Sequence, residues 1–200
     1  GHIMKFFSLE NPIWKFIGNL ADFFLLSCLW YLCCLPVVTA GAATTALYYV
    51  TLKMARGQEG QLIPAFFHSF KQNLKQATAL WVGILLLLDL LICLQTSSVF
   101  AGAMFFTSVV LLACWALFIT MLFPLVARCD NTIGALFKMG IAMALRNVMP
   151  VLAALMVTVA FFAVGVFVFW PVLLVAPGLA SYCNAVLFNR IFDKYGMTLE

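Results

Sequence analysis

The sequence predicts an all-α integral membrane protein, a polytopic transmembrane helical bundle. Hydrophobic residues make up 66% of the 200 positions, and charged residues only 9%. An ordinary soluble domain has about 45–50% apolar and about 25% charged residues. The composition therefore excludes a typical soluble enzyme, a disordered chain and a soluble nucleic-acid-binding module. We treat residues 1–200 as one membrane domain, with residues 1–3, which precede Met4, as a cloning scar.

Six apolar segments are candidate membrane spans, and they form three successive hairpins. A helix rises about 1.5 Å per residue, so about 20 residues cross a hydrocarbon layer of about 30 Å. Backbone polar groups left unpaired in lipid are too costly for an irregular crossing, so the spans must be helical. The candidate spans cover residues 16–38, 42–54, 77–96, 101–127, 148–170 and 172–191.

Two of these spans are irregular. Residues 42–54 reach only about 20 Å as a helix. This span must extend into residues 39–41, sit in a thinned layer or be re-entrant, and the sequence leaves these options open. The span at residues 172–191 is broken by Pro177-Gly178.

Two amphipathic stretches each precede a span. In residues 64–76, the apolar side chains of Phe66, Phe67, Phe70 and Leu74 form one stripe. In residues 132–146, the apolar side chains also recur with a period near 3.6. We expect both stretches to lie in the headgroup layer as interfacial helices before the chain turns into the bilayer.

The basic residues predict the orientation. If the amino terminus is cytoplasmic and the six spans alternate, all eleven Lys and Arg residues fall on one side. Cytoplasmic loops are enriched in these residues, so both termini are predicted to be cytoplasmic. The positive charge is then a topology signal and needs no nucleic-acid partner. The residues expected to contact lipid headgroups are Lys53, Arg56, Lys71, Lys75, Arg128, Lys138, Arg146, Arg190 and Lys194.

In the first and third hairpins, the second helix begins with a segment that contains Pro and Gly. These segments are residues 36–42 and 171–178. Small-xxx-small pairs follow in both, which lets helices approach closely. Short spans broken at corresponding positions can mark a transporter's binding site. Alternatively, Pro and Gly only shape two tight turns, with hydroxyls bonded to backbone carbonyls. The candidate ligand-binding residues here are Thr39, Thr44, Thr45, Tyr48, Tyr182 and Asn184.

Two carboxylates lie within apolar sequence. Asp89 is in the outer half of the third span, with no basic residue at its depth. An ionisable group in a membrane is a functional candidate, so Asp89 joins the ligand-binding set. It would bind a cation or hydroxyl or relay a proton, or else reach the outer interface about 10 Å away. Asp22 lies one turn inside the first span, and we expect it to pair with Lys15, Lys53 or Arg56.

Motifs of enzymes are absent from the sequence. It contains no P-loop, no G-x-S-x-G and no H-E-x-x-H. His68 is expected to contact headgroups, although a cytoplasmic cleft joining it to Asp130 would favour an enzyme. The seven cysteines are interpreted as small apolar helix residues. We therefore expect a protein that is not an enzyme, with no catalytic residues, no metal ligands and no cofactor.

Three blocks of the sequence resemble the YesL family of bacterial membrane proteins. They are residues 35–50, which begin LPVVTAGA, residues 67–78, FHSFKQNLKQAT, and residues 124–132, which begin PLVAR. The resemblance extends over most of the chain. It implies a multi-pass protein of the bacterial plasma membrane that is associated with carbohydrate uptake. It carries over no catalytic residues.

Two functions compete at this stage. The first is a non-enzymatic accessory component of a carbohydrate transporter complex, held in the membrane by helix packing and lipid contacts. The second is a small-solute transporter or channel with a site at Asp89 and the broken second and sixth spans. A membrane-embedded enzyme is disfavoured by the missing catalytic groups. Helix faces of small residues would also permit a homo-oligomer.

Overall fold

The computed structural model describes residues 12–58, 60–96 and 101–197, without the side chains of residues 12–17, 94–96 and 101–104. All regular elements in this part of the chain are helical, which confirms the all-α prediction. The helices are α2 (Pro12–Cys33), α3 (Ala40–Ala55), α4 (Leu62–Thr96), α5 (Ala101–Arg128), α6 (Ile133–Arg146), α7 (Val148–Phe167) and α8 (Ala176–Lys194). Two short 3-10 helices, η1 (Val37–Thr39) and η3 (Trp170–Leu174), complete the set.

The chain is a helical membrane protein by the length and hydropathy of its helices. Three described segments are long and apolar enough to cross a membrane: Leu62–Cys93, Phe105–Arg128 and Val148–Phe167. Gly18–Cys33 is a shorter apolar helix. The remaining long helices, α3 and α8, are the most densely buried, and each packs against several of the others.

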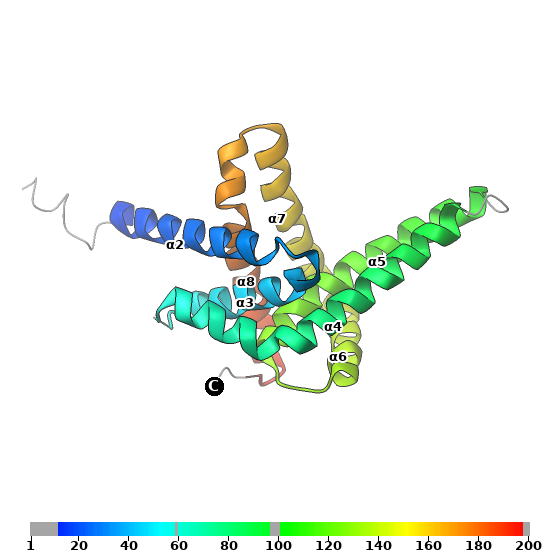
Figure 1. The fold of residues 1–200 in the computed structure, drawn as a ribbon, viewed down its shortest axis with the longest axis horizontal. Coiled ribbons are helices and arrows are strands. Elements are labelled where there is room, and N and C mark those ends of the chain that lie inside the picture. The colour runs from blue at the N-terminus through cyan, green and yellow to red at the C-terminus, as the bar shows by residue number, and fades with distance from the viewer. Residues whose placement is uncertain (1–11, 59, 97–100, 198–200) are drawn as a thin grey trace, which may run out of the picture.

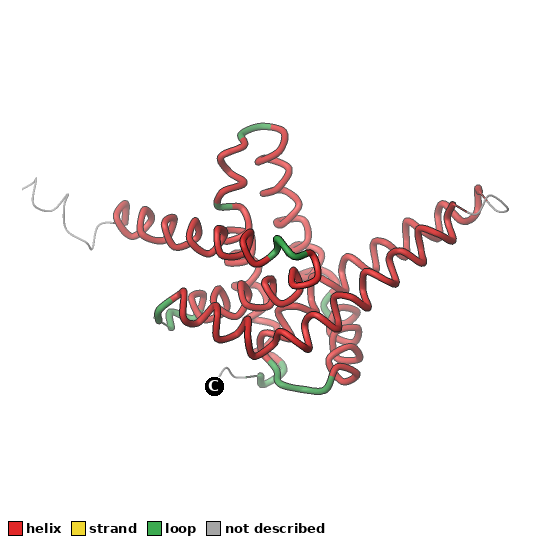
Figure 2. The backbone as a smooth tube through the Cα atoms, viewed as in Figure 1, coloured by secondary structure: helices red, strands yellow, loops and turns green. Residues whose placement is uncertain are grey.

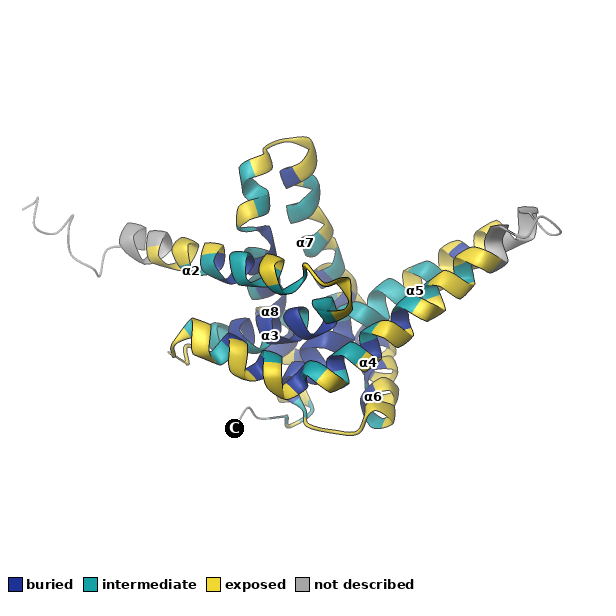
Figure 3. Ribbon diagram, viewed as in Figure 1, coloured by how far each residue is buried: buried dark blue, intermediate teal, exposed yellow. Residues whose placement is uncertain are grey.

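The helices form three hairpins, α2–α3, α4–α5 and α7–α8, that share a centre and then diverge. In Figure 1, the α4–α5 hairpin extends well beyond the other helices, while α7 and η3 reach away in another direction. Figure 2 shows that short loops connect successive helices. Buried residues gather where α3, α5 and α8 meet, and exposed residues dominate the far ends of the hairpins (Figure 3).

Small residues let α3 occupy the centre. Ala42, Ala43 and Ala46 are fully buried. A Cβ added at Gly41 would lie 2.6 Å from the Trp81 Cβ and 2.8 Å from the Ala77 oxygen. The backbones of α3 and α4 therefore approach more closely than any larger side chain at this position would allow.

A second close approach joins α2 to α8. A Cβ at Gly178 would lie 2.5 Å from the Phe23 carbonyl oxygen. The Gly178 N–H donates to Ser27 Oγ at 2.9 Å, and Ser27 Oγ donates to the Phe23 carbonyl at 2.7 Å. The Pro177-Gly178 break therefore begins α8 and supplies it with a polar contact to α2, because N–H groups in the first turn of a helix have no partner within it.

The two related hairpins turn through similar 3-10 segments. Pro36 precedes η1, and Pro171 lies at the start of η3. At these turns, α2 ends at Cys33 rather than at residue 38, and α8 begins at Ala176 rather than at residue 172. The helix α3 is longer than its predicted span of residues 42–54 and extends into residues 40 and 41. Proline disfavours helix in the preceding residue, and this accounts for the stop before Pro36.

The expectation of an interfacial helix at residues 64–76 is wrong. These residues continue without a break into the third span, as one helix of 35 residues. Its buried face contains Phe66, Ser69 and Asn73, whereas Phe67 is exposed. No proline or other helix-breaking residue separates the two parts, so the helix continues. The second amphipathic stretch does form a separate helix, α6, whose Thr132 cap accepts a hydrogen bond from Ala135 N.

Replacement of Gly178 by Ala tests the α2–α8 contact. The new Cβ would clash with the Phe23 backbone, which cannot move as a side-chain tip can. We expect Gly178→Ala to lower the free energy of unfolding by about 1–3 kcal/mol, measured by thermal unfolding in detergent. Gly83→Ala is the matched control, since nothing lies within 4 Å of a Cβ at Gly83. Equal stability of the two variants would contradict the packing described here.

Candidate functional site

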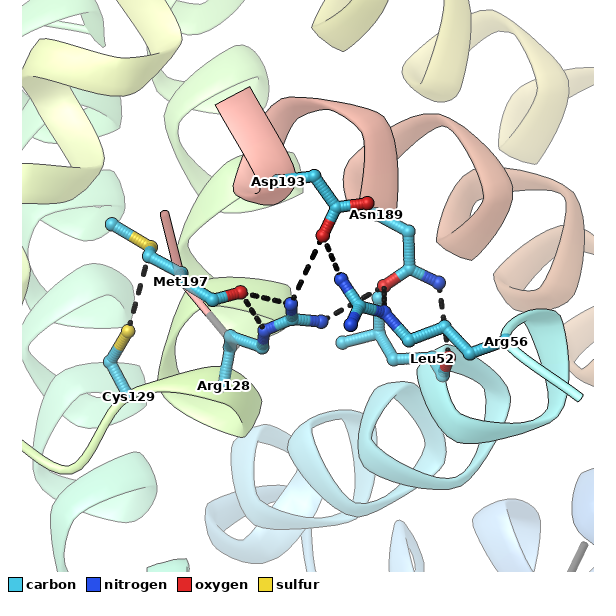
Figure 4. Close-up of polar contacts among 7 residues, drawn as sticks. All are labelled: Leu52, Arg56, Arg128, Cys129, Asn189, Asp193 and Met197. Atoms are coloured by element: carbon cyan, nitrogen blue, oxygen red, sulfur yellow. Dashed lines mark hydrogen bonds and ion pairs between the residues drawn. The ribbon is translucent and has the colours of Figure 1, made fainter. Parts of the chain in front are cut away.

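A cluster of polar side chains joins α3, α5, α8 and the residues after α8. It contains Arg56, Arg128, Asn189 and Asp193, and the carbonyl of Met197, and we refer to it as the Asn189 cluster (Figure 4). Each helix contributes from its last turns, so the cluster lies at the ends of the helices. The same ends carry the basic residues that predict orientation.

Asn189 is the centre of this cluster. Its Oδ1 accepts from Arg56 Nε at 3.0 Å and from Arg128 Nη1 at 2.9 Å. Its Nδ2 donates to the Leu52 carbonyl at 3.0 Å. One amide side chain therefore forms hydrogen bonds with two guanidinium groups and with a backbone carbonyl near the end of α3, as Figure 4 shows.

Asp193 and Met197 complete the contacts of the arginines. Arg56 Nη2 forms an ion pair with Asp193 Oδ1, and Arg128 Nη2 lies 3.6 Å from the same oxygen. Arg128 Nε donates to the Met197 carbonyl at 3.0 Å. Asp193 is 60% exposed, so water still reaches the acidic partner. The cluster therefore acts as a structural joint that connects α3, α5 and α8, because the guanidinium groups of Arg56 and Arg128 already have partners within the protein.

The expected headgroup contact of Arg128 is therefore wrong. Its side chain is fully buried, and the guanidinium also lies 5.3 Å from the centre of the Phe192 ring. Arg56 is largely committed to the same cluster, with its side chain 22% exposed. The other predicted headgroup contacts are exposed or half-buried, which leaves that prediction open. These residues are Lys53, Lys71, Lys75, Lys138, Arg146, Arg190 and Lys194.

The thiol of Cys129 lies beside this cluster. Its Sγ is 3.7 Å from the Met197 sulfur. Burial raises the pKa of the Cys129 thiol above its usual value, and this effect outweighs the opposite influence of Arg128. The thiol is therefore protonated at neutral pH and is a poor nucleophile.

The candidate ligand-binding residues do not form one pocket. Tyr48 and Asn184 do meet, with Asn184 Nδ2 donating to Tyr48 Oη at 3.2 Å and to Thr158 Oγ1 at 2.8 Å. Asn184 Oδ1 is buried without a hydrogen-bond partner. Thr158 was not predicted, because a threonine in the middle of an apolar run gives no signal of its partner.

The three candidate threonines instead bond to backbone carbonyls. Thr39 Oγ1 donates to Cys33 O at 2.7 Å, Thr44 to Ala40 O at 2.8 Å and Thr45 to Gly41 O at 2.9 Å. This geometry matches the turn-shaping interpretation. Thr44 also accepts from Trp30 Nε1 at 3.1 Å.

A cleft of about 780 Å³ lies between α2, the end of α3 and the start of α4. We call it the α2–α3 cleft. Tyr182 is the one predicted ligand-binding residue in its lining. The other lining residues are Asn19, Asp22, Phe23, Val50, Lys53, Met54, Gly57, Gln58, Gly60, Gln61, Leu62 and Ala65. This cleft could not be predicted from the sequence, because its walls come from separate helices.

Asp22 lines this cleft without the expected ion pair. Neither Lys53 nor Arg56 lies within 4 Å of its carboxylate, and the side chain of Lys15 is outside the described residues. Arg56 is occupied by Asp193, and Lys53 Nζ sits 4.5 Å from the centre of the Tyr49 ring. The cleft therefore presents one carboxylate and one ammonium that are not paired with each other.

Asp89 lies far from these polar groups. It is exposed on α4, eight residues beyond Trp81, which contacts the first turn of α3 at Gly41. The helical rise places it about 12 Å along α4 beyond the level of the first turn of α3. It does not line the α2–α3 cleft. The structure thus separates Asp89 from the broken second and sixth spans.

His68 and Asp130 lie outside the α2–α3 cleft, and they are not bonded to each other. His68 is exposed on α4, and Asp130 accepts from Gln72 Nε2 at 3.4 Å. Among the described residues, no group of three or more His, Cys, Asp or Glu has metal-binding proximity.

Replacement of Arg128 tests the Asn189 cluster. Arg128→Gln removes several hydrogen bonds and leaves the Met197 carbonyl without its donor. We expect a loss of about 2 kcal/mol or more in the free energy of unfolding, measured by denaturant titration in mixed micelles. Arg146→Gln is the matched control, since Arg146 also ends a helix but is exposed. Its expected change is within about 0.5 kcal/mol. Similar losses in the two variants would rule out the joint.

Comparison with known proteins gives one match. Residues 23–93 match a family model described as "Protein of unknown function, DUF624". The matched region begins in α2 and ends near the end of α4, and it includes most of the α2–α3 cleft. No curated protein and no solved structure matches the chain. This part of the chain is therefore similar to a family for which no activity is described.

Proposed function

We propose that this chain is a non-enzymatic accessory component of a carbohydrate uptake system in the bacterial plasma membrane, with both termini in the cytoplasm. The carbohydrate assignment rests on the resemblance to the YesL family. Two of the three blocks that carry that resemblance, residues 35–50 and 67–78, fall inside the matched region at residues 23–93. The third block, residues 124–132, lies outside it.

The position of Asp89 supports a partner within the membrane. The far end of the α4–α5 hairpin extends past the other helices (Figure 1), and we call it the α4–α5 tip (residues 85–93 and 105–114). Asp89 is exposed within the first of these two ranges. Most side chains there are apolar and exposed, such as Leu86 at 65% and Phe106 at 74%. Asp89 makes no hydrogen bond or ion pair with another described side chain.

An exposed carboxylate on an apolar helix is expensive in lipid. Ionisable side chains within membrane segments face a protein interior or an aqueous path, where they find a partner. A neighbouring helix that donates a hydrogen bond or a positive charge to Asp89 would meet this requirement. We therefore place the contact with the transporter's membrane subunit at the α4–α5 tip.

The polar groups elsewhere support a structural role. The two arginines of the Asn189 cluster are engaged with Asn189 and Asp193, and the Cys129 thiol is protonated. Enzymes need a nucleophile or base within reach of a polarising group. The described polar clusters do not offer that arrangement, and so we favour an accessory role over catalysis.

The transporter alternative has less support. It requires Asp89 and the broken spans to line one path. The separation of about 12 Å along α4 places Asp89 on the exposed tip, whereas Tyr48 and Asn184 are buried at the centre. We therefore do not propose a transport path through this chain.

Co-purification from the native membrane tests the proposal. The full-length, tagged protein should recover a membrane subunit of a carbohydrate transporter, identified by mass spectrometry. Asp89→Leu should reduce that recovery at least tenfold, because the variant lacks the carboxylate that the partner contacts. Its unfolding temperature in detergent should stay unchanged.

Asp130→Asn is the control, because it removes a carboxylate that lies outside the α4–α5 tip. Asp130 is exposed on the loop before α6, and its variant should recover the transporter subunit as the wild type does. Absence of such a subunit from the wild-type preparation, or equal recovery with Asp89→Leu, would refute the proposal.

A further inference from the structure

We propose that the α2–α3 cleft binds the headgroup of a zwitterionic phospholipid, with the ammonium group beside Asp22 and the phosphate beside Lys53. This inference requires the chain to lie in a membrane. It does not depend on the accessory role or on the partner at the α4–α5 tip.

The charges in the cleft favour a ligand that carries both signs. Among the described residues of the lining, Asp22 is the one acidic residue and Lys53 is the one basic residue. They come from different helices, α2 and α3, and they are not paired with each other. A ligand with a cation and an anion a few bonds apart can satisfy both. An anionic headgroup would satisfy Lys53 but would be repelled by Asp22.

The remaining polar groups suit a phosphate and its esters. Gln58 and Gln61 lie on and beside the loop between α3 and α4, and Asn19 and Tyr182 lie on the walls. Their amide and hydroxyl groups can donate to phosphate oxygens or accept from an ammonium group. Among the described residues, these four side chains have no hydrogen-bond partner, so their donors are available.

The apolar part of the lining suits the lipid's hydrophobic end. Phe23, Val50, Met54, Leu62 and Ala65 share the cleft with the polar groups. An amphipathic lining of this kind fits the glycerol and first methylene groups better than it fits a free sugar. The volume of about 780 Å³ is within the range of small-molecule pockets, about 300–1,000 Å³.

The position of the cleft matches the depth of a headgroup. Lys53 is in the last turn of α3, and the loop that follows is polar. Apolar residues of α2 and α3 extend from it toward the centre of the molecule. A lysine at such a boundary places its methylene groups in the apolar layer and its ammonium at the surface.

The binding test uses the full chain, stripped of lipid in detergent and examined by native mass spectrometry with added lipids. The probes have identical palmitoyl-oleoyl chains and differ in headgroup: phosphatidylethanolamine and phosphatidylglycerol. We expect the ethanolamine lipid to be retained at least tenfold more tightly. Equal retention of the two lipids would overturn the proposal.

Four variants locate the site. Asp22→Asn and Lys53→Gln should each weaken binding of the ethanolamine lipid about tenfold, while Lys53→Arg should retain it. Lys138→Gln, an exposed lysine on α6, should bind like the wild type. Asp22→Asn, Lys53→Arg and Lys138→Gln should keep the wild-type unfolding temperature in lipid-free detergent, because they break no ion pair between described residues. Lys53→Gln also loses the contact with the Tyr49 ring, so its free energy of unfolding should fall by no more than about 1 kcal/mol. Unchanged binding in both Asp22→Asn and Lys53→Gln would show that the lipid binds elsewhere.

A soluble competitor separates headgroup recognition from acyl-chain recognition. Glycerophosphoethanolamine carries the same charged groups without the chains. We expect it to displace the bound lipid at millimolar concentration from the wild type. Failure to displace the lipid would mean that the chains alone determine binding, and the assignment to Asp22 and Lys53 would be wrong.

Discussion

The arrangement of the three hairpins depends on the polar joint around Asn189. This one side chain accepts from Arg56 and Arg128 and donates to the Leu52 carbonyl, so it ties α8 to both α3 and α5. Two neighbouring arginines would otherwise repel each other. The exposed carboxylate of Asp193 offsets their charge and remains in contact with water, which limits the cost of desolvation. The joint fixes the helices at one end and leaves their other ends free to diverge.

Away from this joint, small residues allow α3 to pack closely against α4, and α8 against α2. Gly41 and Gly178 each bring two backbones together, at α3–α4 and at α2–α8. In lipid there is little hydrophobic force between helices, so close packing and hydrogen bonds must hold them together. The result is a buried centre with a largely exposed hairpin extending from it, as Figure 3 shows.

The helices could be predicted from the sequence because their signals are local. Apolar runs, the prolines at 36 and 171 and the threonine cap of α6 each act within a few residues. The continuous helix α4 was missed because Ser69 and Asn73 look like surface residues, yet both are buried in the structure. An amphipathic pattern separates polar from apolar positions. It does not show whether a small polar residue faces solvent or a neighbouring helix.

The candidate site was predicted only in part. Tyr48 and Asn184 do meet, but the pairing of Arg128 with Asn189 and the walls of the α2–α3 cleft come from residues far apart in sequence. A single sequence contains no signal for such contacts. Arg128 resembles an ordinary topology signal at the end of a span, and only its neighbours in space show that it is buried.

These features divide the molecule into two ends with different chemistry. One end carries the Asn189 cluster, the α2–α3 cleft and most of the charged side chains, which suits the boundary between lipid headgroups and water. The other end is apolar and carries the carboxylate of Asp89. A protein that anchors to lipid at one end and to a partner helix at the other would use both.

The charged loops are predicted to lie on one side of the membrane, and the two turns that contain Pro36 and Pro171 on the other. Single cysteines placed in a cysteine-free variant, treated in intact cells with a membrane-impermeant maleimide, test this prediction directly. Cysteines at Val37 and Val168 should react in intact cells, whereas those at Gln58 and Asn131 should react only after permeabilisation. Reaction of the cysteine at position 58 or 131 in intact cells, together with protection of the cysteine in either turn, would contradict this topology.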